Sequence, residues 1–307
     1  MMKKKLVVGM LNTGKSGLEE RLFSRVAKRK GVKLVMINLS KRFNEKEFEK
    51  EIAPCDVVYN NAGEEFVLEP LKAIEEYGKQ VVDGSKLYYY TEDKWMCYVK
   101  CREHGIPTPK TTLLPSNLAL AKAELREFGQ WPVVLKRIYG MEGKFVEKAD
   151  NLAEALAILR SIWAKDIDKL PFVAQEYIKS YAYRVTMIGG KIVQAVIKKS
   201  RHWKCTGVYS GDCEKFRVDK KLRALLGKVY RATRINICGI YLLKRGKEWL
   251  VLEVNTEPGL VFVRAEYEKL IGCIFDFILK TARKRKPKKS KKTVRIPVAQ
   301  LHLRKIR

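Results

Sequence analysis

The chain has 307 residues, of which 46% are hydrophobic, so it can fold around at least one substantial core. Its apolar runs all fall well short of the roughly 18 residues that a membrane-spanning helix needs. Seven cysteines without a Cys-x-x-Cys pair, together with only three histidines, argue against a zinc cage. This cysteine usage fits reduced thiols and predicts a cytoplasmic location.

The formal net charge is +29, from 63 basic and 34 acidic residues. Residues 281–307 contain twelve Lys or Arg and no acid, and removing these twelve charges leaves +17 for residues 1–280. Both parts favour anionic partners. The tail over 283–307 is predicted to be a disordered polycation that contacts RNA, the ribosome or an acidic peptide. The tail carries no RNA-reading motif, so a purely nucleic-acid-binding protein ranks third, below the two hypotheses that follow from the motifs described next.

Apolar runs alternate with helical spacing in the first 90 residues. The run over 6–11 predicts a first strand rather than a secretory leader. The elements expected after it are helices at 17–30, 44–53 and 68–77 and strands at 33–38, 56–59 and 80–83. Such alternation predicts a small parallel α/β layer.

A helix is expected next over 91–103, with Thr91 as its N-cap and Glu92 and Asp93 in its first turn. The segment from Gly105 to Pro109 ends this helix and forces an extended connection. Further along, the pattern predicts strands within 131–148 and at 172–178, 184–188, 191–197, 239–243 and 249–254, and helices at 151–163, 220–234 and 267–282.

The segment from Leu252 to Leu260 reads as a strand that stops at a Pro-Gly turn. Strand side chains alternate between faces, so Glu253 and Asn255 point the same way. A carboxylate and an amide oxygen on one face suit Mg²⁺, which also binds substrate phosphates. A plain polar-out strand in an antiparallel sheet explains the same pattern when the segment is taken alone.

A second basic and glycine-bearing segment lies upstream. Lys136 ends an apolar strand and precedes Gly140 and Gly143, whose missing side chains let backbone N–H groups approach an anion. A solvated lysine before an ordinary turn is the simpler reading of this pair alone. The apolar strand with a polar break over 173–178 offers backbone edges to an adenine ring, and Arg184 follows it.

Taken together, these segments resemble the ATP-grasp superfamily, in the branch of ribosomal-protein glutamate ligases and their relatives. The resemblance covers residues 6–282 and rests on six motifs in family order: Asp93-Lys94, Gly105–Pro109 with Thr111, Lys136 with Gly140 and Gly143, Gln175–Ile178, Gly189-Gly190-Lys191, and Glu253-x-Asn255-x-x-Pro258-Gly259. It implies an α/β fold: a parallel α/β domain at 1–90, a central lobe at 91–172 and a C-terminal lobe at 173–282, with ATP between the last two.

The resemblance also implies a reaction, in which ATP phosphorylates a carboxylate and an amine displaces phosphate to give an amide. Lys94 and Lys136 would contact the ATP phosphates, and Arg184 and Lys198 would stabilise charge on the transferring phosphoryl group. Glu253 and Asn255 would hold Mg²⁺, with Mn²⁺ as an alternative.

The remaining implied contacts surround the nucleotide. Glu176 and Tyr177 would flank the adenine, and Gly140 and Gly143 would shape a lid over the phosphates. Lys204 and Thr206 fall where relatives place further polar groups on the nucleotide side. The excess positive charge of the body favours an anionic substrate, such as a glutamate-like amino acid or an acidic peptide. The oligomeric state is left open.

The chain departs from the family pattern at several positions. Tyr241 stands where close relatives carry an aspartate twelve residues before the metal-binding glutamate, so one metal ligand is lost. Thr206 replaces an asparagine, Ala182 replaces an acid, and Phe145 replaces a lid glycine. A degenerate ATP-grasp protein that binds nucleotide without turnover is therefore the second hypothesis.

The N-terminal segment contains a competing motif. Gly9-x-x-x-x-Gly14-Lys15-Ser16 satisfies the P-loop pattern and lies between an apolar run and a helix. A P-loop NTPase would leave the six family motifs unexplained, and no later strand of four apolar residues ends in aspartate. A plain glycine turn, or a βα turn facing a substrate anion, accounts for the pattern equally well.

Overall fold

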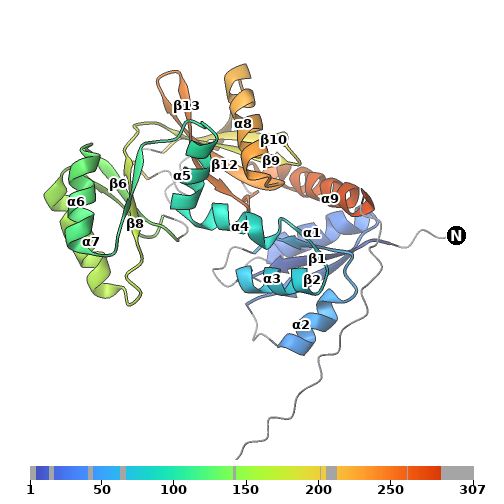
Figure 1. The fold of residues 1–307 in the computed structure, drawn as a ribbon. Coiled ribbons are helices and arrows are strands. Elements are labelled where there is room, and N and C mark those ends of the chain that lie inside the picture. The colour runs from blue at the N-terminus through green and yellow to red at the C-terminus, as the bar shows by residue number, and fades with distance from the viewer. Residues whose placement is uncertain are drawn as a thin grey trace, which may run out of the picture.

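The computed structural model describes residues 5–13, 17–40, 44–62, 67–140, 143–200, 202–204, 213–260 and 262–284. These residues form three sheets, each with helices packed on it (Figure 1). The basic tail predicted over 283–307 lies almost wholly outside the described residues. No helix in the described part of the chain combines the length and apolar content that a membrane crossing needs.

The N-terminal sheet is fully parallel, as predicted, with the strand order β2-β1-β3-β4. Its elements are β1 (Val7–Asn12), α1 (Gly17–Arg29), β2 (Lys33–Asn38), α2 (Glu45–Ile52), β3 (Val57–Asn60), α3 (Leu68–Glu76) and β4 (Gln80–Val82). The central strands β1 and β3 are buried along their whole length, which explains their unbroken apolar runs.

The single helix predicted over 91–103 is two helices. α4 (Ser85–Glu92) includes Thr91, and α5 (Lys94–Glu103) begins after it. The predicted N-cap was wrong because Asp93 is extended and caps α5. Its carboxylate accepts hydrogen bonds from the backbone N–H of Trp95 (2.8 Å) and Met96 (3.0 Å). An aspartate competes well for this position because its short side chain reaches those otherwise unpaired N–H groups.

The central sheet has the order β5-β8-β6-β7 and is antiparallel throughout. Its elements are β5 (Thr111–Leu114), α6 (Leu118–Phe128), β6 (Val133–Arg137), β7 (Val146–Ala149), α7 (Leu152–Lys165) and β8 (Phe172–Glu176). Buried Leu125 of α6 and Leu159 of α7 share one core with Phe172. Neither β5 nor α6 was predicted from the sequence, although Asn117 and left-handed Gly129 mark the two ends of α6.

The five-stranded C-terminal sheet carries most of the predicted site residues. Its order is β11-β10-β9-β12-β13, with β9 (Ala182–Ile188), β10 (Lys191–Lys198), β11 (Cys213–Lys215), β12 (Ile237–Arg245) and β13 (Glu248–Asn255). One face packs against α5 and α8 (Lys220–Thr233) through a core that includes Cys97, Cys101 and Leu226. The two cysteines are therefore core residues, as predicted from their helical spacing.

The end of the described chain returns to its beginning. A short 3₁₀ turn (Arg264–Glu266) leads into α9 (Tyr267–Lys284), which lies beside α1 (Figure 1). Phe275 packs edge-on against Phe23 of α1, with ring centroids 6.0 Å apart. Buried Leu260, Tyr59 and Ile237 belong to the same core, so one apolar cluster joins the N-terminal layer to the C-terminal sheet.

Asp83 adds a polar link between the same two layers. Its carboxylate accepts hydrogen bonds from the backbone N–H of Asn236 (2.8 Å) and Ile237 (2.9 Å) and from Nδ2 of Asn236 (2.6 Å). Burial raises the pKa of Asp83 to about 6, although these hydrogen bonds oppose the rise. The end of β4 is thereby tied to the start of β12.

Candidate functional site

The site is built on paired positions of β9, β12 and β13. Tyr241 pairs with Arg184 on one side and with Glu253 on the other, and Gly239 pairs with Asn255. Paired residues point to the same face of a sheet, so these side chains share the face opposite α5 and α8. A register shift follows Tyr241 in the β12–β13 ladder, as is common beside functional sites.

Arg184 is a buried cation of this face, with an exposed fraction of 1%. Its Nη1 donates to the carbonyl oxygen of Gly259 at 2.7 Å, while buried Nε and Nη2 have no hydrogen-bond partner among the described residues. Burial lowers the pKa of Arg184. A buried guanidinium with two unused donors suits an anionic ligand, because unpaired buried donors are costly.

Lys198 of β10 lies in the same environment and is fully buried. Its Nζ is 4.7 Å from the ring centroid of Phe262 and 5.3 Å from that of Tyr241. The guanidinium carbon of Arg184 is 4.3 Å and 5.0 Å from the same two centroids. Two aromatic faces therefore hold two cations close together, and burial strengthens such cation–π contacts.

Two further cations reach this region from other elements. Lys94, the first residue of α5, donates from Nζ to the carbonyl oxygen of Gly140 at 2.8 Å. Lys136 on β6 donates to Oε1 of Gln175 at 2.7 Å. Burial lowers the pKa of Lys136 to about 8, opposed by the nearby charge of Glu253 and reinforced by that of Lys94. The structure thus brings Lys94, Lys136 and Glu253 together.

The glycine-bearing loop has the backbone that its residues predict. Gly140 (φ 144°) and Gly143 (φ 74°) both have positive φ, which glycine adopts at little cost. Phe145 has φ 54°, so the phenylalanine that replaces a family glycine keeps a glycine-like conformation. The guanidinium of Arg137 stacks on its ring at 3.9 Å from the centroid.

The residues expected around the adenine lie at the C-terminal end of β8, an interior strand of the central sheet. The Glu176 carboxylate accepts from Arg245 at 3.1 Å and from the Lys110 backbone N–H at 2.8 Å. Tyr177 meets Trp203 edge-on at a centroid distance of 6.4 Å. The carboxylate of Glu176 is therefore already occupied, and the backbone N–H groups of Glu176 and Tyr177 donate to the carbonyl oxygens of Lys110 (2.9 Å) and Pro132 (3.2 Å).

Lys204, the residue after Trp203, forms an ion pair of 3.2 Å with Glu147 of β7. A loop after β10 therefore contacts the central sheet. Thr206, the other polar group expected there, lies outside the described residues.

The described residues suit one hard cation. Glu253 and Asn255 share a face, and the Asn255 Oδ1 also accepts from the backbone N–H of Glu257 at 2.8 Å, which orients the amide. Tyr241 supplies no carboxylate, and burial raises its pKa. Among the described residues, no cluster of three or more His, Cys, Asp or Glu side chains could hold a metal ion by itself. A cation here would depend on phosphate and water for its remaining ligands.

The P-loop pattern does not match the local structure. Gly9 lies inside β1 rather than in the following loop, and a Cβ there would be 2.9 Å from Sγ of Cys55. Packing between β1 and its neighbours explains this glycine. Gly14, Lys15 and Ser16 lie outside the described residues.

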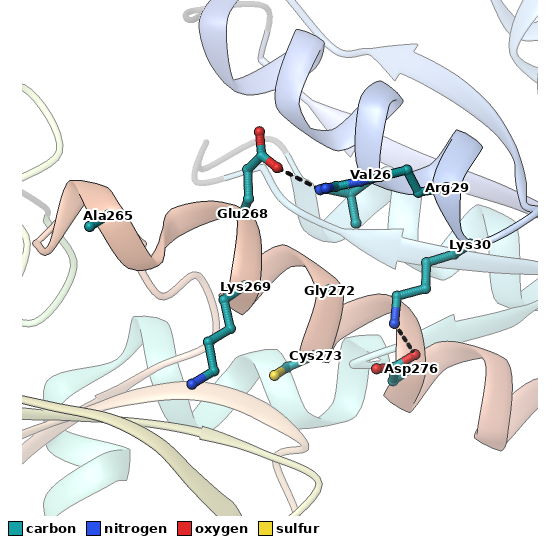
Figure 2. A pocket seen from close by; sticks show the side chains of 9 residues that line it. All are labelled: Val26, Arg29, Lys30, Ala265, Glu268, Lys269, Gly272, Cys273 and Asp276. Atoms are coloured by element: carbon teal, nitrogen blue, oxygen red, sulfur yellow. Dashed lines mark hydrogen bonds and ion pairs between the residues drawn. The ribbon is translucent and has the colours of Figure 1, made fainter.

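A groove of about 520 Å³ lies elsewhere, between α1 and α9 (Figure 2). Arg29 pairs with Glu268 at 2.5 Å, and Lys30 pairs with Asp276 at 2.7 Å, both across the groove. None of the residues that line it belongs to the predicted site. Four of its five charged side chains are paired in this way, and these pairs join the two helices.

Sequence reasoning missed Phe262 and Gly239. Phe262 follows the Pro-Gly turn and stacks on both buried cations, and a Cβ at Gly239 would lie 2.5 Å from Nη2 of Arg184. The pairing of Gly239 with Asn255 gives the glycine a place beside the predicted metal ligands, but only the strand register reveals it.

The chain is similar to several known proteins. A "Probable alpha-L-glutamate ligase" of Histophilus somni is 27% identical over 176 residues, which are 56% of this chain and 57% of that protein. The protein of the same description from Teredinibacter turnerae is 27% identical over 71% of this chain and 73% of its own length. The chain thus spans little more than half of the first relative.

The solved structure of a D-alanine–D-alanine ligase from Bacillus anthracis matches 91% of this chain and 99% of its own, with a TM-score of 0.71 and 18% identity, which supports the fold. Residues 91–272 match the RimK-like ATP-grasp domain, and this span contains α5, the glycine-bearing loop and the Glu253–Asn255 pair. The chain therefore belongs to the RimK-like ATP-grasp family.

Proposed function

We propose that this protein is an ATP-dependent carboxylate–amine ligase that forms an amide bond through an acylphosphate. The observation that carries the proposal is the convergence of Arg184, Lys198 and Glu253 on one sheet face, with Lys94 and Lys136 beside it. Two donors of buried Arg184 are unused among the described residues. Phosphoryl transfer depends mainly on positioning and on cationic neutralisation of phosphate oxygens.

The nucleotide would lie between the lobes 91–172 and 173–282, beneath the glycine-bearing loop. Lys94 and Lys136 would contact its phosphates, and the backbone of 176–177 would face the adenine. Glu253 and Asn255 would hold Mg²⁺, or Mn²⁺ in its place, and such an ion bridges and neutralises phosphate oxygens.

Arg184 and Lys198 would act on the transferring group. Held over the rings of Tyr241 and Phe262, they cannot swing away as phosphate charge moves. A fixed cation of this kind stabilises a transition state without reorganising during the reaction. Arg184 would bind the carboxylate or acylphosphate oxygens through Nε and Nη2, the two donors that Gly259 does not use.

The substrate class and setting follow from charge. We propose an acidic substrate, such as a glutamate-like amino acid or an acidic peptide, because residues 1–280 carry +17 without the tail. We also propose a cytoplasmic location and a polyanion such as RNA as the partner of the tail. Cutting the chain after Ala282 should weaken RNA binding at low salt and leave ATP binding unchanged; unaltered RNA binding would contradict the role of the tail.

A nucleotide-binding protein without turnover is the second candidate, and one observation favours it. The position opposite Glu253 holds Tyr241 rather than a carboxylate, so less negative charge is available to fix a metal ion.

Labelled oxygen separates the two candidates. The protein is incubated with ATP, Mg²⁺, an amine and glutamate or a glutamyl peptide that carries ¹⁸O in its carboxylates. A ligase transfers one ¹⁸O to inorganic phosphate and yields an amide detected by mass spectrometry. Tight ATP binding with neither product, across acidic and neutral substrates, would favour the second candidate.

A further inference from the structure

We propose that the phosphate site of this chain holds a single divalent cation on Glu253 and Asn255, and that Tyr241 together with the cations it holds excludes a second one. This inference rests on the proposed function, because it concerns the ion that accompanies the nucleotide. It assigns to Tyr241 a role in metal stoichiometry.

The sheet face offers few side-chain oxygen donors to a metal ion. Glu253 pairs with Tyr241, and Asn255 pairs with Gly239, which has no side chain. Opposite the two proposed metal-binding residues, β12 therefore places only the phenol of Tyr241 and the backbone of Gly239. Two-metal phosphoryl-transfer sites hold their ions about 3.5–4 Å apart, and each ion needs oxygen ligands of its own. One carboxylate and one amide do not supply two such sets.

The next acid along the chain does not fill the gap. Glu257 follows the Asn255 turn, but its carboxylate Oε1 is buried. Burial raises the pKa of Tyr59 in the N-terminal sheet, and the charge of Glu257 adds to that rise. The backbone N–H of Glu257 contacts the proposed metal ligands, because it donates a hydrogen bond to Oδ1 of Asn255. Glu257 therefore belongs to the contact between the C-terminal turn and the N-terminal layer.

Two positive charges lie close to the ring of Tyr241. The Arg184 guanidinium and the Lys198 ammonium lie 5.0 Å and 5.3 Å from its ring centroid, and Phe262 holds both from another ring. A divalent ion bound between Tyr241 and Glu253 would meet two buried positive charges with one carboxylate to offset them. Like charges at such distances repel strongly in a poorly solvated site.

Arg184 and Lys198 also provide the positive charge that a second divalent ion would supply to the phosphates. Four basic side chains, Lys94, Lys136, Arg184 and Lys198, lie around the site, and Glu253 is the carboxylate that the described part of the chain places among them. One divalent ion added to this set already balances a triphosphate well. The rings of Tyr241 and Phe262 keep Arg184 and Lys198 in place. A carboxylate at position 241 would instead add a negative charge beside them.

The test counts metal ions bound to the nucleotide complex, without any measurement of turnover. The protein is saturated with a non-hydrolysable ATP analogue and titrated with Mn²⁺, and electron paramagnetic resonance measures the unbound ion. We expect one bound Mn²⁺ per protein in the wild type and in Tyr241→Phe, which keeps the ring. Tyr241→Asp, which places a carboxylate opposite Glu253, should bind two.

Two bound ions in the wild type would overturn the inference, as would a Tyr241→Asp variant that stays at one. If Tyr241→Asp does not fold, Tyr241→Asn serves instead and is expected to show a second, weaker Mn²⁺ equivalent; its absence would count against the role of Tyr241. Binding of the analogue is measured separately by calorimetry. Failure of the wild type to bind it would contradict the proposed function, whereas analogue bound with two ions contradicts this inference alone.

Discussion

Tyr241 and Glu253 occupy directly paired positions on β12 and β13, and the ring of Tyr241 lies under two buried cations. Glu253 is the carboxylate of this pair, and Tyr241 contributes a ring beneath two cations. The following expectations rest on the proposed role of this pair at the phosphate site.

Replacing Glu253 by Gln should lower ligase turnover at least about 100-fold, because removing one preorganised charge at a phosphoryl site costs about 3 kcal/mol of transition-state stabilisation. ADP formation with the acidic substrate measures this. Glu248→Gln, at the exposed start of the same strand, is the matched control and should keep wild-type turnover. Equal turnover in both variants would remove Glu253 from the mechanism.

Gly239→Ala should lower turnover and leave the fold intact. The added Cβ would lie 2.5 Å from Nη2 and 2.7 Å from Nε of Arg184, so the guanidinium must move away from its two aromatic contacts. A displacement of this size typically costs on the order of 100-fold in rate.

Gly227→Ala is the control for that substitution. Gly227 lies within α8, where a Cβ meets only the flexible end of Arg231 at 3.4 Å. Alanine should raise the unfolding free energy by up to about 1 kcal/mol. Turnover and thermal unfolding are measured for both variants. A fully active Gly239→Ala protein would show that catalysis does not require Arg184 to be held in this position.

The buried Asp83 should make stability depend on pH. Its pKa rises from 3.8 to about 6 on folding, so between these values the folded state keeps a proton that the unfolded chain releases. The unfolding free energy should therefore fall as pH rises from about 4 to about 6, by on the order of 3 kcal/mol, and this contribution should be constant above that range. Urea unfolding at several pH values measures the fall.

Asp83→Asn should flatten this slope because its side chain does not titrate. The exposed Asp150, paired with Lys148 on the surface, gives the control variant Asp150→Asn, which should keep the wild-type slope. A slope that survives in Asp83→Asn would show that another group causes it.

Apolar packing rather than ion pairing should hold α9 to the N-terminal layer. Phe275→Ala should cost about 3–5 kcal/mol, since its ring is buried against Phe23. Glu268→Gln removes two ion pairs, to Arg25 and Arg29, whose arginine side chains are 63% and 58% exposed. It should cost about 1 kcal/mol or less and nothing measurable at high salt. Chemical unfolding at low and high salt compares the two, and a larger loss in Glu268→Gln would reverse this ranking.

Much of the fold could be predicted because apolar patterns reflect burial directly. The parallel layer follows from β1 and β3, whose residues are all buried. The boundary between α4 and α5 could not be read in this way, because Thr91 and Asp93 are both good N-caps and the extended backbone of Asp93 decides between them.

The candidate site was only partly predictable for a different reason. Glu253 and Asn255 follow from alternation along one strand, a local property. The contacts of Arg184 with Phe262 and Gly239 join residues more than fifty positions apart, and they depend on strand register and on the path of the chain after the Pro-Gly turn. The spacing of apolar residues along the sequence does not reveal which strands pair or in which register.

The central claim is that ATP lies between the central and C-terminal lobes and not at the N-terminal turn. Lys94 of α5 and Lys136 of β6 would bind its phosphates there. Calorimetry of ATP binding to Lys136→Met and Lys15→Met tests this claim most directly. The account predicts that Lys136→Met weakens affinity at least about tenfold, or 1.4 kcal/mol, while Lys15→Met binds ATP like the wild type. Loss of binding in Lys15→Met with unchanged affinity in Lys136→Met would contradict it.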